Sequence, residues 1–452
     1  MKIVVFGGSF NPAGTHHREI AAMLSGMFDK VKIVVCGPRP DKPTTNDIDP
    51  VHRAAMADLT FGQPGSSMEV DISDLENETF TRTHELDARY SSEGEVWHLI
   101  GTDLIAGGHK KESAIHKVWK YGGELWERLN FVVALRAGVS FDERDLPPKH
   151  IILRVNNPGS SEEIRRRASN HGALHGLVTP EVREYIERHN LYRGYSSNQQ
   201  TRLVLDNPKL LVVADSHNNE AAAIAKSIAS LESAEPNLVV SIGGDGTMLR
   251  AIKRYWRLRL PFFGINAGHL GFLLNDVSGT IDGELFGSEL TGFHSPLLYV
   301  QTANQGGDPR EFLAFNDAWV ETLGKAGWFE IKVDGRVVVP RLVGDGVLVS
   351  TAAGSAAYAQ AMGAKPVPIG KDILVVVGSN VFEPLHWQKN LPLESLIEFR
   401  SVDKTGYRKV YGFADGEALG EIVSMRVRRS RIAAAELMFL RDNDIRRKVL
   451  AQ

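Results

Sequence analysis

Several features are scarce or missing in this chain of 452 residues, and each absence excludes a class of protein. Cys36 is the only cysteine, which excludes an internal disulfide or a cysteine metal cluster and fits a reducing compartment. No apolar run approaches the roughly 20 residues that a membrane-spanning helix needs, and the first residues read as a strand instead of a signal peptide. The formal net charge of −3 implies no general affinity for nucleic acid or anionic membranes. We therefore expect a cytoplasmic enzyme.

The first half of the chain alternates short apolar strands with amphipathic helices. Buried strands are predicted at 3–6, 31–35, 97–100, 131–135 and 151–153. Ile20, Met23, Leu24 and Met27 recur with helical spacing and predict one apolar helix face. Ser160 with Glu163 reads as a capping box, and Thr179-Pro180 reads as the start of a further helix that runs through His189. This alternation predicts a parallel, doubly wound sheet.

The segment 194–201 is polar, rich in small residues and without periodicity, so we place a domain boundary there. Beyond it the pattern restarts, with strands at 210–214 and 238–242 and an alanine-rich helix at 219–232. From about residue 290 the pattern favours strands, including a hairpin around Asp334-Gly335.

The most informative stretch is Gly243-Gly-Asp-Gly-Thr247, directly behind a predicted strand. Its three glycines let backbone N–H groups approach a phosphate, because no Cβ is in the way and positive φ is allowed. Asp245 stands between them and would repel phosphate unless it had another task. It is suited to take a proton from a hydroxyl that attacks phosphorus, or to hold Mg²⁺. An ordinary strand-ending turn is the structural alternative.

A second glycine-rich stretch, Gly7-Gly-Ser-Phe-Asn-Pro-Ala-Gly-Thr-His-His17, follows the first strand and opens the first helix. In open α/β sheets, ligands bind at the carboxyl ends of the strands, where helix N-termini offer free N–H donors. A histidine at that place can donate to phosphate oxygens and stabilise the charge that develops as a phosphoanhydride forms. A histidine that merely caps the helix is the alternative.

With this stretch, residues 1–194 resemble nicotinate/nicotinamide mononucleotide adenylyltransferases. Matching segments follow in order: Pro38 with Lys42, Arg53-Ala-Ala-Met56, Thr79-Phe-Thr81, Ile100-Gly-Thr-Asp103, Trp119, Gly159-Ser-Ser-Glu-Glu-Ile-Arg165 and Val178 through Tyr192. The resemblance implies that the mononucleotide phosphate attacks the α-phosphorus of ATP, with His17 as catalytic residue and pyrophosphate leaving on Mg²⁺. It implies ATP-phosphate contacts from Gly8, Ser9, Phe10, Thr15, His16, Lys42, Ser160, Ser161 and Arg165. It assigns the mononucleotide to Thr81, Asp103 and Trp119, with Trp119 stacked on the pyridine ring.

Residues 203–445 resemble NAD kinases. The motifs are Gly243 through Arg250, Gly264 through Leu273, Asn316-Asp317, Gly344 through Tyr358, and Asp415-Gly416. The resemblance implies that Asp245 accepts the proton of the adenosine 2′-hydroxyl of NAD as this oxygen attacks the γ-phosphorus of ATP, and that burial near other carboxylates makes it a better base. It implies NAD or ATP contacts from Gly243, Gly244, Gly246, Thr247, Arg250, Asn266, Phe272, Asn316, Asp317, Asp345, Thr351, Tyr358 and Asp415. Among these, Asp345 would bind near the nicotinamide end, and Tyr358 would pack on it.

The sequence departs from the pattern of each family, at Gly14 in the first half and at positions 352, 353, 356 and 361–364 in the kinase half. The His-x-Gly-His core of the adenylyltransferases falls on Gly14, Thr15, His16 and His17, so the first histidine is missing. Loss of one donor to a developing phosphate charge costs on the order of a hundredfold in rate, unless His16 or Thr15 supplies the contact. In the kinase half, Ala352, Ala353 and Ala356 replace family residues that include two threonines, which weakens individual nucleotide hydrogen bonds by about 1 kcal/mol each.

We therefore expect an α/β chain of two domains. Residues 1–194 form a doubly wound, Rossmann-like nucleotidyltransferase domain, and residues 195–452 an NAD kinase-like domain with an α/β part at about 203–290 and a β-rich part at about 291–445. The expected function is NAD synthesis in front and NAD phosphorylation behind, with Mg²⁺ as cofactor and ATP, mononucleotide and NAD as small-molecule partners. No protein ligand for a metal is assigned, and the kinase resemblance implies a homo-oligomer. Two alternatives stay open for the front domain: adenylylation of another phosphorylated substrate such as phosphopantetheine, or a non-catalytic nucleotide-binding regulator.

Overall fold

The structure is a computed structural model that describes residues 1–39, 42–62, 65–136, 141–157, 159–194, 200–268, 271–277, 281, 283–307, 309–403 and 405–441. The chain divides into two compact units, residues 1–195 and 196–452. Most of the segment in which the sequence predicts a boundary, 195–199, lies outside the described residues. Among the helices described, none combines the length and apolar character that a membrane crossing requires.

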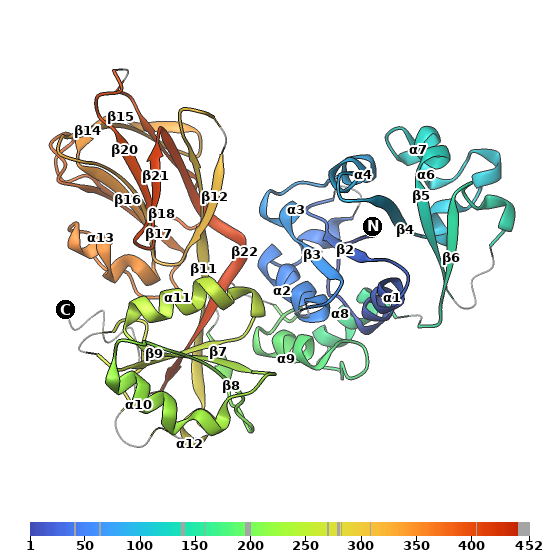
Figure 1. The fold of residues 1–452 in the computed structure, drawn as a ribbon, viewed down its shortest axis with the longest axis horizontal. Coiled ribbons are helices and arrows are strands. Elements are labelled where there is room, and N and C mark those ends of the chain that lie inside the picture. The colour runs from blue at the N-terminus through green and yellow to red at the C-terminus, as the bar shows by residue number, and fades with distance from the viewer. Residues whose placement is uncertain are drawn as a thin grey trace. The chain divides into compact units, whose positions relative to one another are not determined.

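The first unit is built on a six-stranded sheet with the order β3-β2-β1-β4-β5-β6 (Figure 1). Every neighbouring pair is parallel, which confirms the predicted doubly wound architecture. The strands are β1 Lys2–Gly8, β2 Lys30–Val35, β3 Met68–Asp71, β4 Glu95–Gly101, β5 Asn130–Arg136 and β6 His150–Val155. The sequence did not indicate β3, because this short edge strand has no fully buried residue and thus no apolar run.

Helices lie between these strands and after the last of them. They are α1 Thr15–Ser25, α2 Pro50–Phe61, α3 Ser73–Glu76, α4 Thr83–Tyr90, α5 Thr102–Ile105, α6 Ala114–Val118, α7 Gly122–Arg128, α8 Ser161–Ser169 and α9 Pro180–Arg188. Asp49 caps α2 and Thr179 caps α9, each accepting a backbone N–H of the first turn and each followed by proline.

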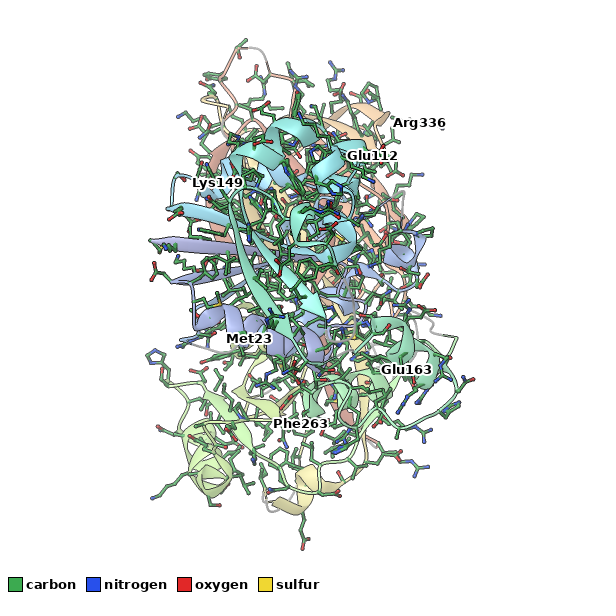
Figure 2. The ribbon with its side chains drawn as sticks, turned by 90° about the vertical axis from the view of Figure 1, so that its right-hand side faces the viewer. Met23, Glu112, Lys149, Glu163, Phe263 and Arg336 are labelled. Carbon is green, nitrogen blue, oxygen red and sulfur yellow. The ribbon has the colours of Figure 1, made fainter. Side chains whose placement is uncertain are left out.

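Two local predictions for these helices were wrong. Met23 and Met27 are 40% and 42% exposed, so the buried side of α1 is formed by His16, Ala21 and Leu24 (Figure 2 labels Met23). Ser160 does cap α8, but the Glu163 carboxylate pairs with arginines of the following turn. The capping box is therefore only half formed.

The second unit contains two sheets (Figure 1). The larger has the order β15-β14-β19-β22-β10-β9-β8, with β11 pairing to β22, β12 and β7; its β8, β9 and β10 are mutually parallel. The smaller is fully antiparallel, with the order β18-β17-β16-β13-β20-β21. The strands are β7 Thr201–Leu203, β8 Leu210–Ala214, β9 Leu238–Gly243, β10 Phe262–Asn266, β11 Leu290–Ala303, β12 Arg310–Ala314, β13 Asp317–Thr322, β14 Gly327–Val333, β15 Arg336–Gly344, β16 Gly346–Thr351, β17 Ile373–Ser379, β18 Gln388–Pro392, β19 Ile397–Ser401, β20 Val410–Ala414, β21 Glu417–Ile422 and β22 Ser424–Leu440.

Helices cover both faces of the parallel strands in this unit. Helix α11 (Asp245–Tyr255) lies on one face, and α10 (Asn219–Ser227) and α12 (Gly283–Gly287) lie on the other (Figure 1). Met248 and Ile252 of α11 pack with Phe262, whereas Phe286 of α12 packs with the next residue of β10, Phe263. This alternation along β10 explains why the strand is apolar throughout: it is buried on both faces. The predicted α/β part and β-rich part are thus confirmed.

Candidate functional sites

The loop between β1 and α1 holds a histidine in a defined tautomer. The backbone N–H of Gly14 donates to Nδ1 of His17 over 3.1 Å. Because Nδ1 accepts this bond, the proton of the neutral ring lies on Nε2. The buried ring of Phe10 meets the His17 ring edge-on, with centroids 5.1 Å apart, and so helps to fix its orientation. The bond from Gly14 makes His17 part of a capping box at the start of α1, as the capping alternative expects, and its contact with phosphate stays a prediction.

His16 fills space that two glycines leave open. A Cβ on Gly14 would lie 2.7 Å from Cε1 of His16, and a Cβ on Gly159 would lie 2.5 Å from its Nδ1. Real side chains do not approach so closely, so the buried ring of His16 requires glycine at both positions. The ring also lies against His17, with centroids 3.9 Å apart. An imidazole from residue 16 thus occupies the place where a side chain of residue 14 would begin.

A buried arginine ties the same loop to two neighbouring segments. Arg53 of α2 is 1% exposed and donates to the carbonyl oxygens of Ser9 (2.7 Å), Cys36 (2.6 Å) and Thr45 (3.1 Å). These carbonyls lie after β1, after β2 and in the short helical turn 43–46. One guanidinium therefore fixes the mutual positions of three segments at the carboxyl edge of the sheet.

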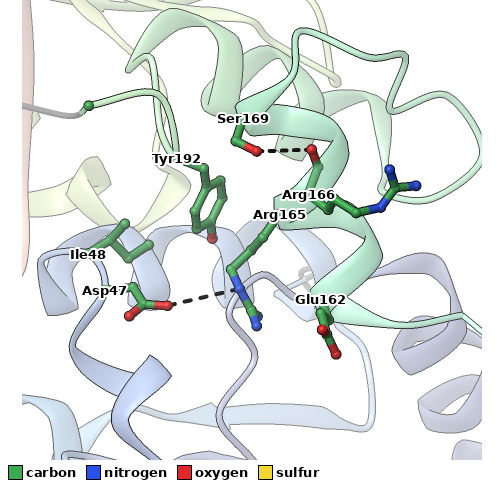
Figure 3. A pocket seen from close by; sticks show the side chains of 8 residues that line it. Asp47, Ile48, Glu162, Arg165, Arg166, Ser169 and Tyr192 are labelled. Atoms are coloured by element: carbon green, nitrogen blue, oxygen red, sulfur yellow. Dashed lines mark hydrogen bonds and ion pairs between the residues drawn. The ribbon is translucent and has the colours of Figure 1, made fainter.

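The start of α8 also joins this loop. The Ser161 hydroxyl donates to the carbonyl of Pro12 (2.9 Å), and the Arg165 guanidinium donates to that of Asn11 (2.6 Å). Arg165 also lines an open pocket of about 560 Å³, where its Nε lies 4.0 Å from the Asp47 carboxylate (Figure 3). The predicted phosphate residues of the loop and of α8 are therefore brought together.

Positive charge gathers on one side of the loop. Burial, together with the charges of Arg39, Arg165 and Arg53, lowers the pKa of Lys42. Mutually repelling cations of this kind are stabilised when an anion such as a polyphosphate binds between them.

A pocket of about 160 Å³ opens directly beside Gly8, and Thr81 and Trp119 line it. The N–H and hydroxyl of Thr81 both donate to the buried carboxylate of Asp74, at 2.8 and 2.5 Å. Two other predicted residues lie elsewhere. Asp103 is exposed at the start of α5 and does not line this pocket, and the Thr15 hydroxyl donates to the carbonyl of Gly176 (2.8 Å).

In the second unit, the loop after β9 has the geometry that its glycines predict. Gly243 has φ +151°, and a Cβ there would lie 2.7 Å from Oγ1 of Thr247, so only glycine fits. Gly244 caps α11, and Gly246 is exposed in its first turn. Arg250 donates to Thr247 Oγ1 over 3.0 Å.

Asp245 is held by the neighbouring motif. Its two carboxylate oxygens accept the backbone N–H groups of Phe272 and Leu273, each at 3.0 Å. Asn266 ends β10, where its side chain bonds to Gly268 N–H (3.1 Å) and to Asp276 (2.7 Å). Residues 269 and 270 of this motif lie outside the described residues. Asp245 is only half-buried, whereas the prediction placed it in a buried carboxylate cluster.

The carboxylate pair lies at Asp317, which is buried, and Asp415, which is half-buried. Asp415, in the turn between β20 and β21, accepts the N–H groups of Phe315 (2.6 Å), Asn316 (2.8 Å) and Asp317 (3.2 Å). Burial, together with the charge of Asp415, raises the pKa of Asp317 to about 7. Asn316 Oδ1 and Asp317 Oδ2 are buried atoms without a hydrogen-bond partner, which is uncommon and points to a missing ligand or water.

The long motif 344–358 packs against this pair. Thr351 donates through Oγ1 to the carbonyl of Phe315 (2.9 Å), and a Cβ on Gly354 would lie 2.3 Å from the carbonyl oxygen of Asn316. The structure therefore brings together Asn316, Asp317, Thr351 and Asp415.

Tyr358 and Asp345 lie further along the same subdomain. Tyr358 is 55% exposed and stacks on Trp319 (5.2 Å between centroids), which in turn stacks on Phe413 (4.9 Å). Asp345 accepts the Asn380 amide (2.7 Å) and lines a pocket of about 840 Å³ with Met362 and Trp387. An exposed aromatic stack of this kind offers a flat surface for a planar ring.

Sequence reasoning missed several residues that shape these sites. Trp319 has no motif signal, because an aromatic residue inside a strand reads as core. The partners of Arg53 are backbone carbonyls, which no residue pattern reveals. An arginine within the apolar helix 50–61 was the one available signal, since a buried arginine must be bound by several acceptors.

Family models of known proteins match parts of both units. A family model described as cytidylyltransferase-like matches residues 5–167, and one described as the ATP-NAD kinase N-terminal domain matches residues 177–278. NAD kinase of Cereibacter sphaeroides (strain ATCC 17025) is 32% identical over 207 residues, which cover 45% of this chain and 81% of that protein. NAD kinase of Rickettsia rickettsii is 29% identical over 241 residues, covering 52% of this chain and 94% of that protein. A crystal structure of yeast NADH kinase complexed with NADH aligns at 16% identity and a TM-score of 0.42, covering 78% of this chain and 86% of that one.

Fold and comparisons together define an ATP-binding transferase with a kinase unit and a nucleotidyltransferase-like unit. The chain belongs to the NAD kinase family and so to NAD and NADP biosynthesis, with a cytidylyltransferase-like domain joined in front of the kinase.

Arg53→Met tests the anchoring of the first loop. The substitution leaves three buried carbonyl groups without their donor, so we expect a loss of roughly 3 kcal/mol in the free energy of unfolding of the first unit. Urea unfolding of the full chain measures this loss. Arg166→Met, at an exposed arginine of α8, is the matched control and should stay within about 0.5 kcal/mol of the wild type. Equal effects of the two substitutions would contradict the anchoring role.

Asp317→Asn tests the carboxylate pair through pH. The pKa of Asp317 rises from 3.8 to about 7 on folding, so between these values the folded state holds a proton that the unfolded state has lost. The stability of the second unit therefore falls as pH rises through this window. The Asp317→Asn variant cannot ionise at this position, so it does not lose this stability. We expect the melting-temperature difference, variant minus wild type, to grow between pH 5 and pH 8. The control, Asp206→Asn at an exposed site, should show no such growth; a pH-independent difference for Asp317→Asn would sink the assignment.

Proposed function

We propose that the first unit transfers AMP from ATP to nicotinamide or nicotinate mononucleotide, and that the second unit phosphorylates the adenosine 2′-hydroxyl of NAD with ATP. The observation that carries the first assignment is the pocket lined by Thr81 and Trp119, which opens beside Gly8 of the phosphate loop. Gly7 and Gly8 of the phosphate loop line the same pocket, so a planar base held there would lie beside that loop. This arrangement supports a mononucleotide as acceptor over a substrate without an aromatic ring.

In the proposed adenylyl transfer, an oxygen of the mononucleotide phosphate attacks the α-phosphorus of ATP. The bond from this phosphorus to the bridging oxygen breaks, and pyrophosphate leaves with the Mg²⁺ that accompanies ATP. The attacking oxygen is already ionised, so positioning and charge neutralisation matter more than a base. His17 Nε2 donates to the developing charge, and Lys42 and Arg165 bind the phosphates.

In the proposed kinase reaction, Asp245 takes the proton of the 2′-hydroxyl while that oxygen attacks the γ-phosphorus and ADP leaves. The N–H groups of Phe272 and Leu273 hold the carboxylate in place. Each carboxylate oxygen can accept more than one hydrogen bond, so the hydroxyl still has an acceptor. Backbone N–H groups at the start of α11 face the phosphates.

The second unit also offers acceptors for NAD. Asn316 Oδ1 and Asp317 Oδ2 are buried and unpaired, and ribose hydroxyls or an adenine amine would satisfy them. The exposed ring of Tyr358 would pack on a planar group of the dinucleotide. If the first unit receives the amide mononucleotide, its product is the substrate of the second.

Exchanging the residues at positions 14 and 16 tests whether His16 replaces the missing donor. We expect His16→Gly to lower the rate of pyrophosphate release by roughly a hundredfold. Gly14→His alone should also lose activity, because its side chain meets the ring of His16. The double variant Gly14→His/His16→Gly removes the collision with His16, leaves only the flexible end of Ile164 (Cδ1, 2.9 Å) to shift, and restores a second imidazole, so it should recover to within about tenfold of the wild type.

NADP formation by the same preparations is the control for folding. Full activity of His16→Gly, or a double variant that is worse than either single one, would contradict this role.

Asp245→Asn tests the proposed base. The amide keeps the shape of the side chain but cannot accept the hydroxyl proton, so NADP formation should fall by roughly a thousandfold. Pyrophosphate release with mononucleotide in the same sample should stay unchanged and serves as the internal control. NADP formation near the wild-type rate would show that another group is the base.

A further inference from the structure

A second pocket, of about 300 Å³, adjoins the proposed mononucleotide pocket and shares Arg39, Phe80, Thr83 and Trp119 with it. Its apolar lining consists of Phe80, Trp119, Val118 and Leu125. Its ionisable lining consists of Arg39, Arg82, His84 and Lys120, and no carboxylate lines it among the described residues. An aromatic floor surrounded by cations is the environment that an anionic planar ring prefers.

Arg82, His84 and Lys120 are additional to the cations of the phosphate site, whereas Arg39, whose charge also lowers the pKa of Lys42, is common to both. Lys42 and Arg165 do not line this pocket. Arg39 reaches it with its guanidinium 5.0 Å from the centre of the Phe80 ring. Arg82 and His84 come from the start of α4, and Lys120 follows α6, so three segments far apart in sequence place positive charge around one space.

The nearby carboxylates do not cancel this charge. Glu85 lies outside the pocket lining, and its carboxylate accepts the Arg82 N–H (2.7 Å). That bond, together with the charges of His84, Arg82 and Lys120, lowers the pKa of Glu85, which reports a positive potential. Asp74 lines the adjoining pocket, but its carboxylate already accepts three hydrogen bonds from Thr79 and Thr81.

We propose that this cationic pocket selects a pyridine mononucleotide whose ring bears a carboxylate over the one whose ring bears a carboxamide. This inference rests on the proposed adenylyltransferase function of the first unit. The two substrates have nearly the same size and differ by one negative charge, so charge is the property by which a protein separates them. Arg82 and Lys120 are exposed, so water screens them and each contributes about threefold to the preference.

The selection has a consequence for the fused chain. Adenylylation of the acid yields a dinucleotide that still carries the ring carboxylate, whereas the second unit is expected to act on the amide, NAD. An amidation of that carboxylate, by a separate enzyme that supplies the nitrogen, must then stand between the two reactions. The two units would catalyse two steps of one route without being consecutive.

The test compares the full-length protein with ATP, Mg²⁺ and either the acid or the amide mononucleotide, following pyrophosphate release. We expect kcat/KM for the acid to exceed that for the amide by about tenfold, the combined effect of several screened cations. Lys120→Gln and Arg82→Gln should each lower this ratio by about threefold, and Lys120→Arg should retain it. Lys117→Gln, which removes an exposed charge outside the lining, is the matched control and should leave the ratio unchanged.

Equal or better use of the amide by the wild type would overturn the inference and leave the adenylyltransferase proposal standing. A ratio that is insensitive to both Arg82→Gln and Lys120→Gln would overturn the assignment to these residues. Pyrophosphate release with neither mononucleotide would overturn the adenylyltransferase proposal itself, and this inference with it.

Discussion

A buried charge must be matched by hydrogen bonds, and both units use this constraint to shape their ligand loops. Moving a charged group out of water without partners is too costly for a folded chain to sustain. In the first unit, the buried guanidinium of Arg53 is matched by three backbone carbonyls. In the second unit, the half-buried carboxylate of Asp415 is matched by three backbone N–H groups. Arg53 thereby joins three segments that are far apart in sequence, whereas Asp415 joins its own turn to the single segment 315–317.

The charge of the central side chain determines which backbone groups bind to it: carbonyl oxygens bind the Arg53 guanidinium, and N–H groups bind the Asp415 carboxylate. Arg53 draws carbonyl groups inward beneath the loop of the first unit, where Gly14 N–H is bonded to His17. Asp415 accepts the backbone N–H groups of residues 315–317, and the side chains of Asn316 and Asp317 each have one buried oxygen without a hydrogen-bond partner. The first arrangement presents donors for phosphate, and the second presents acceptors for hydroxyl or amine groups. The proposed ligand groups differ correspondingly, because phosphate oxygens accept hydrogen bonds whereas the hydroxyl and amine groups of NAD donate them.

The sequence predicts those structural features that depend on local residue patterns. Apolar runs such as 238–242 are buried on both faces, and the loops at Gly7 and Gly243 follow strands and open helices as predicted. The burial of individual side chains was harder to predict from the sequence. The exposed Met23 and Met27 follow the helical period although they do not face the core, because a periodicity cannot say which side is covered.

Contacts between distant segments account for the rest. The space around His16 depends on Gly14 beside it and on Gly159, which lies far along the chain, and no spacing rule connects these positions. Asp245 was expected among buried carboxylates, whereas the antiparallel pairing of β13 and β20 brings together buried Asp317 and half-buried Asp415. The cations of the second pocket come from three segments that are far apart in sequence, so they carry no motif.

The central claim is that one chain carries two separate nucleotide-transfer sites. The most direct measurement gives the unmodified full-length protein ATP and Mg²⁺ with mononucleotide in one reaction and with NAD in another, and identifies the products by phosphorus NMR. The account predicts pyrophosphate and a dinucleotide in the first reaction, and ADP with a 2′-phosphate monoester in the second. Absence of pyrophosphate with both the acid and the amide mononucleotide, or absence of the 2′-phosphate, would contradict it.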